Sequence, residues 1–408
     1  MTVGVTGFVG ERLTEAREAR GIMTRTSFAD LLQVVSTEAI RQYENNICNP
    51  RPEVVAEMAK KLNVKEAFFF RPLHRTVRNP IFWRSRHAAT KVDRVVAERK
   101  FSWAKSISDE YLKSYLDMPR LVMPNRKELG VPDDPRELGY GEVELIAMRC
   151  REFWGLGSMP IPNMTVFLEN NGLLITCGHL ESKKLDAFSN VSEYDGSFHV
   201  FLGTDNDNGA RSRFDAAHEL AHLILHSHLS QEYMDDEKMK KHGLVEYQAY
   251  RFASTFLMPS DSFRDDVWMT SLEALLSLKE RWRVSVAAMI KRCDDLGILD
   301  DTHSRRLWIN YNRAWRKDGE PLDDKVPFEA PELMKRCFDL LIDSNAKTKA
   351  QIVHELPYSQ RDIESLMNLP ESYLSEDFGE VRQLPTIKTP SESYGDTNGK
   401  VIPFGSKR

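Results

Sequence analysis

The feature that most constrains this chain is a His-Glu-x-x-His motif formed by His218, Glu219 and His222. The motif lies in a largely apolar stretch, residues 211–228, whose hydrophobic spacing predicts one continuous helix. Residues four positions apart project from the same face of a helix, so both imidazoles can bind a single zinc ion. Glu219 would then lie beside the water that this ion activates. Because buried histidines need polar partners, a metal is the simplest partner for the pair.

A zinc site able to catalyse hydrolysis needs a third protein ligand, and two residues compete for that role. His228 has the spacing of an extended zinc motif, but Leu225 stands where a glycine would break the helix and turn the histidine back. Glu246 lies at the start of a second periodic helix, predicted over 244–259. We expect Glu246 to be the third ligand, with His228 as the alternative. An ordinary solvated glutamate is the competing interpretation of Glu246.

Length and composition indicate a reduced, cytoplasmic protein of two or three domains. The chain has 408 residues and a formal net charge of -5, which by itself selects no partner. Its five cysteines lack a Cys-x-x-Cys spacing, so neither a disulfide framework nor a cysteine zinc site is expected. The N-terminus lacks the pattern of a signal peptide, and no stretch approaches the roughly 18 apolar residues of a membrane span. We therefore expect neither secretion nor membrane insertion.

Residues 10–65 show the pattern of four or five short helices with a helix-turn-helix at the centre. Thr24 and Ser36 can cap the second and third helices, and Pro52 can begin the fourth. In the third helix the apolar residues point one way. The opposite face exposes side chains of the kinds that reach base edges and phosphates, namely Thr37, Glu38, Arg41, Gln42 and Asn45.

The stretch VSTEAIRQYENN, followed by NPRPEVVAEMAKKLNV, resembles the Xre-type, phage-repressor-like helix-turn-helix. The resemblance implies binding to an operator-like site on double-stranded DNA, as a symmetric homodimer. It also implies roles by position: Thr37, Glu38 and Gln42 would face bases, and Arg25 and Arg41 would hold phosphates. One departure is the turn before Val35, which has no glycine and is one residue longer than the pattern.

The charge near this unit leaves two interpretations open. Residues 1–72 contain ten basic and nine acidic side chains, so a helical dimerisation module that never touches DNA is the alternative to a DNA reader. Residues 73–105 contain nine Lys and Arg against two acids. This basic segment could neutralise phosphates, or it could be a solvated helix face that joins two domains.

The middle of the chain combines helices with a few short strands. A helix is predicted near 143–157, a helix, turn and strand over 163–178, and strands over 186–191 and 197–203. A small sheet beside the zinc helix would give an extended peptide an edge to pair with.

Four segments of this region together resemble the ImmA/IrrE family of zinc-dependent peptidases. They are REFWGLGSMPIPNMTVFLENNGLLI, DAFS, RSRFDAAHELAHLILH and FASTFLMP. The resemblance implies a zincin-like domain with Zn²⁺ held by His218, His222 and Glu246, and with Glu219 as general base. Ala221 replaces a glycine that is frequent in the family, and Tyr250 replaces a frequent asparagine.

These patterns predict a mainly α protein with a small β-sheet, of the α+β class. We divide it into a helix-turn-helix domain (1–72), a basic helical linker (73–140), a zinc metallopeptidase domain (141–300), a C-terminal helical region (301–375) and a tail with the composition of a disordered segment (376–408). The helices predicted after residue 270 are expected to pack against the peptidase domain.

Three functions compete at this point. The first is a DNA-binding transcriptional regulator whose zinc endopeptidase domain cleaves a repressor or another regulatory protein, in a stress-response, mobile-element or toxin-antitoxin setting. The second is an Xre-type repressor or antitoxin whose zinc domain senses a partner or ligand without proteolysis. The third is a stand-alone peptidase whose N-terminal helices recruit substrate. The complete set of ligand and base residues favours the first over the second, and the helix-turn-helix pattern argues against the third.

Overall fold

The structure is a computed structural model of the chain. It describes residues 5–73, 81–85, 90–180, 185–192, 195–205, 208–230, 232–233, 243–315 and 319–375. The chain divides into two units, Met1–Leu374 and Ser375–Arg408, and only Ser375 of the second is described. The predicted tail therefore lies outside the described residues, as do 74–80 and 86–89 of the basic segment. None of the described helices is both long enough and apolar enough to cross a membrane.

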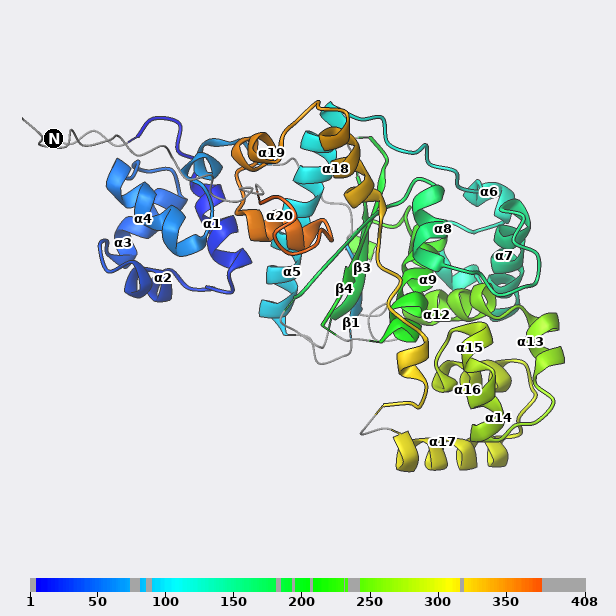
Figure 1. Cartoon of the computed structure of the whole chain (residues 1–408). Coiled ribbons are helices and arrows are strands. Elements are labelled where there is room, and N and C mark those ends of the chain that lie inside the picture. Colours follow the sequence, from blue (N-terminus) through cyan, green and yellow to red (C-terminus); the bar gives the residue numbers. More distant parts are fainter. Residues whose placement is uncertain are drawn as a thin grey trace, which may run out of the picture. The chain divides into compact units, whose positions relative to one another are not determined.

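Four helices form the N-terminal part: α1 (Gly10–Ala19), α2 (Arg25–Leu32), α3 (Thr37–Glu44) and α4 (Pro52–Leu62) (Figure 1). The predicted caps are confirmed, because the Thr24 side chain accepts from the Ser27 amide and the Ser36 side chain accepts from the Ala39 amide. The helices bury a shared apolar core that includes Leu13, Phe28, Ile40 and Met58.

The turn between α2 and α3 contains a residue with a strained backbone. Gln33, the residue after α2, adopts a left-handed conformation with φ of 58°. A non-glycine residue pays about 1–2 kcal/mol for this conformation, and the turn continues for three further residues before α3 begins. The chain thus reverses without the glycine that the pattern of this motif would place there.

Within the described residues the sheet has four strands: β1 (Phe82–Ser85), β2 (Leu174–Gly178), β3 (Leu185–Val191) and β4 (Phe198–Gly203). Their order is β1-β3-β4-β2, with β2 and β4 parallel and the other neighbours antiparallel. The sequence predicted β2, β3 and β4. It missed β1, which lies inside the segment interpreted as a basic linker.

Both faces of the sheet are buried, and its strands β2 and β4 are apolar at most positions. On β3 and β4, Ala187, Val200 and Leu202 belong to one hydrophobic core, while Phe188 and Phe201 belong to another. Neighbouring residues of a strand point to opposite faces, so each strand supplies both cores. Near-continuous apolar strands are typical of a sheet covered on both sides.

The first core packs against the helices of the predicted peptidase region. These are α7 (Tyr140–Phe153), α8 (Met164–Asn170), α9 (Gly209–Leu225), α12 (Leu244–Leu257), α13 (Ser260–Asp266), α14 (Leu272–Ser277), α15 (Lys279–Trp282), α16 (Val286–Asp295) and α17 (Asp301–Trp315). Side chains of α14, α15 and α16 are buried in this core. The prediction that the helices after residue 270 pack against the peptidase region is therefore confirmed for these three.

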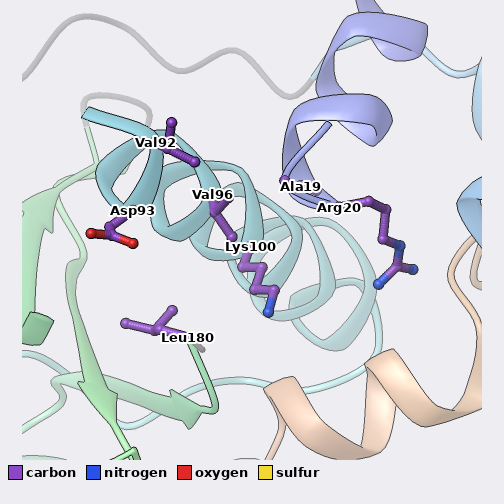
Figure 2. Close-up of a pocket in the computed structure, with 8 residues that line it drawn as sticks. Ala19, Arg20, Val92, Asp93, Val96, Lys100 and Leu180 are labelled. Atoms are coloured by element: carbon purple, nitrogen blue, oxygen red, sulfur yellow. The ribbon is translucent and has the colours of Figure 1, made fainter. Parts of the chain in front are cut away.

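The second core joins segments that are far apart in the chain. It contains residues of the N-terminal helices, of α5 (Lys91–Lys105), and of the C-terminal region with α18 (Leu333–Asp343), α19 (Lys349–Glu355) and α20 (Gln360–Leu366). Arg20, directly after α1, forms an ion pair with Asp362 of α20, and Val64 bridges to Tyr358. A pocket of about 200 Å³ between α1 and α5 is lined in part by Arg20, Val96 and Lys100 (Figure 2).

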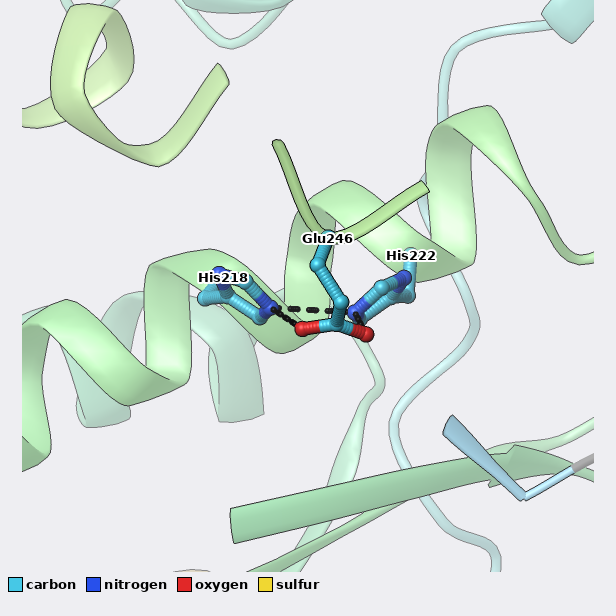
Figure 3. A group of neighbouring side chains, drawn as sticks. All are labelled: His218, His222 and Glu246. Carbon is cyan, nitrogen blue, oxygen red and sulfur yellow. Dashed lines mark hydrogen bonds and ion pairs between the residues drawn. The ribbon is translucent and has the colours of Figure 1, made fainter. Parts of the chain in front are cut away.

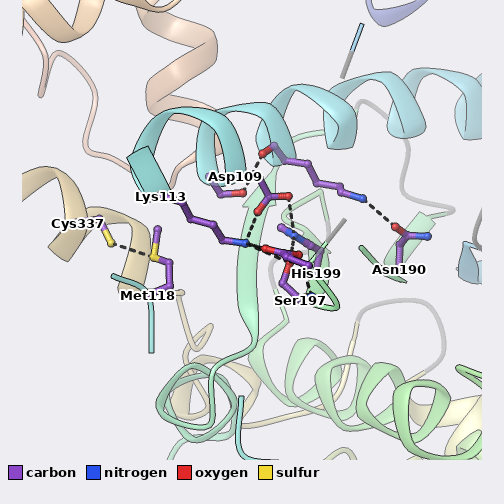
Figure 4. Close-up of polar contacts among 10 residues, drawn as sticks. Asp109, Lys113, Met118, Asn190, Ser197, His199 and Cys337 are labelled. Carbon is purple, nitrogen blue, oxygen red and sulfur yellow. Dashed lines mark hydrogen bonds and ion pairs between the residues drawn. The ribbon is translucent and has the colours of Figure 1, made fainter. Parts of the chain in front are cut away.

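A buried polar cluster holds α5 against the face of the sheet that carries Phe188 and Phe201 (Figure 4). Lys105 donates to Asn190 at 2.9 Å, and Asp109, in the π-helical turn after α5, lies 3.1 Å from the His199 ring. Burial lowers the pKa of His199, and the Asp109 carboxylate opposes this effect. Arg99 pairs with Glu18. At these positions the basic segment is therefore a packed helix that joins two parts of the chain, and not the solvated helix face that was one of the two interpretations of its charge.

The start of α9 provides a test of the first core. A Cβ atom on Gly209 would lie 2.2 Å from the Val326 carbonyl oxygen and 2.3 Å from that of Pro327. The substitution Gly209→Ala must push these backbones apart, so the free energy of unfolding should fall by about 1–3 kcal/mol. Urea denaturation measures the change.

Gly141 of α7 is the matched control, because nothing lies within 4 Å of its Cβ position. Gly141→Ala should leave stability unchanged or raise it by up to about 1 kcal/mol. Equal unfolding midpoints for the two variants would contradict the described packing of α9.

Candidate metal centre

Helix α9 places the His-Glu-x-x-His motif in the interior of the first core. It begins after Asn208, whose side chain accepts from the Arg211 amide, and every residue from Ser212 to Leu225 is buried. The helix ends at Leu225, so the prediction of one helix through residue 228 was wrong at its end. His226 still bonds through its amide to the His222 carbonyl, and the chain then turns.

Three predicted ligands come together in the structure (Figure 3). The Nε2 atoms of His218 and His222 are 3.0 Å apart. One carboxylate oxygen of Glu246 lies 3.2 Å from His218 Nε2, and the other lies 3.5 Å from His222 Nε2. Glu246 reaches the histidines from the first turn of α12, which packs along α9. One ligand atom from each residue lies within 4.8 Å of the other two.

The chemistry of this group fits a zinc ion. Two imidazole nitrogens and one carboxylate oxygen are the donor set of zinc sites that keep an open coordination position for chemistry. The side chains of His218 and His222 are almost completely buried, whereas that of Glu246 is 50% exposed. Solvent and a substrate therefore have access from the Glu246 side.

Glu219, the predicted general base, is completely buried beside the two histidines in the motif. Ser189 of β3 donates a hydrogen bond from Oγ to Glu219 Oε2 at 2.6 Å. Strand alternation explains this contact, because Ser189 points to the same face as Ala187, toward α9, while Phe188 points away. The sequence analysis did not identify Ser189, whose role depends on the register of β3 against α9.

The far side of His222 is enclosed by two further side chains. His222 Nδ1 lies 3.1 Å from Nδ1 of His226, whose Nε2 lies 3.1 Å from Gln248 Oε1 on α12. Burial lowers the pKa of His226 to about 4. The sequence analysis missed both residues, although His226 is spaced four residues after His222 and so lies on the same helix face.

An aromatic ring from β1 covers the same histidines. Phe82 is buried and stacks on His222, with ring centroids 4.9 Å apart and an interplanar angle of 12°. Its ring also lies 6.4 Å from that of His226. The segment predicted to be a basic linker therefore contributes an apolar wall to the candidate metal centre.

His228, the alternative third ligand, is not part of the group. Its ring nitrogen Nε2 donates to the Asp133 carbonyl oxygen at 3.1 Å. The end of α9 at Leu225 places His228 in the following turn, away from the helix face that carries His218 and His222.

The predicted DNA contacts lie on α3 and near it. Thr37, Glu38 and Arg41 are exposed. Arg41 donates two hydrogen bonds to Glu38, and Gln42 donates one, which together lower the pKa of the Glu38 carboxyl to about 2. Arg25 pairs with the buried Glu44, which also binds Arg17. The guanidinium of Arg25 is thus already paired with a buried carboxylate of the helical unit.

A cleft of about 850 Å³ adjoins the two ligand-bearing helices. Phe214 of α9, Tyr250 of α12 and Trp308 of α17 are among the residues that line it. Phe214 lies one helical turn before His218, and Tyr250 one turn after Glu246. An aromatic cleft next to the metal group is a suitable surface for apolar side chains of a peptide.

Two family models match the chain. The IrrE N-terminal-like domain of the M78 peptidases matches residues 170–294, a range that contains all three candidate ligands and Glu219. A helix-turn-helix model matches residues 13–69, which include most of α1 and all of α2, α3 and α4. No curated protein matches the chain at significant similarity.

Removal of one ligand should abolish tight zinc binding. Glu246→Gln keeps the size of the side chain but removes its charge, and zinc affinity should fall by more than the roughly 10–100-fold typical for loss of a ligand's hydrogen-bond partner. Competition with a chromogenic chelator measures the affinity.

His228→Ala is the control, because this histidine bonds to a backbone carbonyl outside the group. Its zinc affinity should equal that of the unmodified protein. A large loss in His228→Ala, with none in Glu246→Gln, would contradict the ligand assignment.

Proposed function

We propose that this chain, which carries a helix-turn-helix DNA-binding domain and an M78 metallopeptidase-like domain, is a cytoplasmic transcriptional regulator with zinc-dependent endopeptidase activity. Its substrate would be a regulatory protein such as a repressor. The observation that carries the proposal is the convergence of His218, His222 and Glu246 beside the buried carboxylate of Glu219.

In the proposed mechanism His218, His222 and Glu246 would hold the zinc ion. Bound there, zinc would supply Lewis-acid polarisation of the peptide carbonyl and would make water acidic enough to be activated near neutral pH. Glu219 accepts the proton of the attacking water and then delivers it to the leaving amine. The hydrogen bond from Ser189 orients the Glu219 carboxylate for both transfers.

The arrangement of the sheet supports a protein substrate. Among the described strands β1 is an edge strand, and it contacts both β3 and α9. An extended peptide could add to this edge by backbone hydrogen bonds, and the neighbouring aromatic cleft could receive its apolar side chains. Cleavage of an extended segment of a folded regulator would fit this site better than the trimming of free amino acids from a chain end.

The N-terminal helices support a role on DNA. A helix-turn-helix domain implies DNA binding, and α3 exposes Thr37 and Arg41 as a recognition helix requires. We propose a homodimer on a two-fold symmetric operator, with Gln42 reading a base and Arg41 contacting a phosphate.

Glu219→Gln should abolish cleavage and leave zinc bound. The amide cannot accept the proton of water, so the cleavage rate should fall by about 10²–10⁴-fold. The assay incubates the zinc-loaded protein with a proteome-derived peptide library and identifies new amino termini by mass spectrometry.

Ser262→Ala is the control, because Ser262 is half-buried on α13, outside the metal group, and bonds to the Ser158 carbonyl. It should cleave like the unmodified protein. Continued cleavage by Glu219→Gln would contradict the role of the base, and absence of cleavage by the unmodified protein with zinc bound would favour a domain that senses a ligand without proteolysis.

DNA binding should depend strongly on salt. On an operator selected from random DNA, Arg41→Ala should weaken binding to all sequences and reduce the slope of log affinity against log salt by about 1. Gln42→Ala should cost about 1–3 kcal/mol on the selected site only. Gel-shift titrations at several salt concentrations measure both effects, and absence of any DNA binding at low salt would contradict this part of the proposal.

A further inference from the structure

A chain of hydrogen bonds behind the metal group begins at an amide whose orientation is fixed. Gln248 of α12 is completely buried, and its Nε2 atom lies 2.7 Å from the Pro135 carbonyl oxygen and 2.9 Å from that of Leu138. A carbonyl oxygen only accepts hydrogen bonds, so both amide hydrogens of Gln248 are used there. Its Oε1 atom is therefore the one that faces His226.

The direction of every following hydrogen bond is then determined. Oε1 of Gln248 can only accept, so Nε2 of His226 carries a proton and donates it over 3.1 Å. In a neutral imidazole the other nitrogen is an acceptor, and Nδ1 of His226 faces Nδ1 of His222 at 3.1 Å. His222 must therefore carry its proton on Nδ1. The lone pair of His222 is then on Nε2, and this is the atom that points to His218 and Glu246.

We propose that Gln248 and His226 are positioning residues that hold His222 in the tautomer able to bind zinc through Nε2. The inference rests on the proposed zinc site and deepens it. Partners of this kind orient a metal-binding histidine and select its tautomer. Here the partner of His222 is a second histidine, His226. The tautomer of His226 is in turn set by the Gln248 amide on α12, the helix that also carries Glu246.

We call the series of hydrogen bonds from Gln248 through His226 to His222 the relay. Its opposite orientation is disfavoured by the backbone carbonyls of the 135–138 segment. If the Gln248 amide were flipped, its oxygen would face two carbonyl oxygens. That oxygen and the Leu138 carbonyl would lack a donor, and the Pro135 carbonyl would keep only the Leu138 amide. If His226 alone changed tautomer, its Nε2 and Gln248 Oε1 would both be acceptors. With both imidazoles neutral, the relay therefore has one arrangement in which every hydrogen bond is made.

The tautomers can be observed in the metal-free protein. Long-range proton–nitrogen correlation spectra of protein labelled with ¹⁵N-histidine distinguish the Nδ1–H form from the Nε2–H form. We expect His222 as the Nδ1–H form and His226 as the Nε2–H form, with assignments from single histidine variants. The opposite tautomer at either residue would overturn the proposal.

Zinc affinity tests the consequence of the relay. His226→Leu leaves Nδ1 of His222 without an acceptor, and the zinc dissociation constant should rise about 10–100-fold. In His226→Asn the side-chain oxygen can replace the lost acceptor, so most of the affinity should return. Equal losses in the two variants, both folded by circular dichroism, would show that His226 only fills space and would overturn the proposal.

Two further variants separate the relay from simple packing. Gln248→Met keeps the length of the side chain but removes the acceptor for His226, so it should weaken zinc binding and shift His226 toward the Nδ1–H form. Phe82→Leu, which changes the ring stacked on His222 without touching a hydrogen bond of the relay, should leave both tautomers unchanged. An unchanged His226 tautomer in Gln248→Met would contradict the proposal.

Failure of the unmodified protein to bind zinc would contradict the proposed function. The spectra of the metal-free protein test the relay independently of that result.

Discussion

Burial of polar side chains along α9 is the constraint on which the structure of this protein depends. Two imidazoles and a carboxylate, from His218, His222 and Glu219, lie in a helix enclosed by apolar side chains. Buried polar groups are costly unless they have partners, so the surrounding elements must supply them. Helix α12 supplies Glu246 and Gln248, and β3 supplies Ser189. The zinc ion that we propose would complete the set.

The sheet connects this centre with the DNA-binding part of the chain. Alternate residues of β3 and β4 face either α9 or α5, so one set of strands forms part of two cores. The second core includes the N-terminal helices and α20, which are joined by the ion pair between Arg20 and Asp362. A displacement of β3 would therefore change two sets of contacts. One is the hydrogen bond from Ser189 to Glu219, and the other is the packing of the core shared with the helix-turn-helix.

Local patterns in the sequence were sufficient for much of this fold. The N-terminal helices begin at the predicted caps, and periodicity together with the family resemblance selected Glu246, which the structure brings beside His218 and His222. Apart from the end of α9, the errors concern contacts between distant segments. Strand β1 exists because it pairs with β3 about a hundred residues later, and Ser189, His226 and Gln248 owe their places to strand register and helix packing. A clue to the second core was present in the near-continuous apolar strands, which indicate a sheet buried on both faces.

X-ray absorption spectroscopy at the zinc edge of the purified, zinc-loaded protein tests the central claim most directly. The account predicts one zinc ion per chain, bound by two imidazole nitrogens and by oxygen ligands, with no sulfur. A protein that takes up no stoichiometric zinc, or whose zinc is bound by sulfur or by a single imidazole, would contradict it.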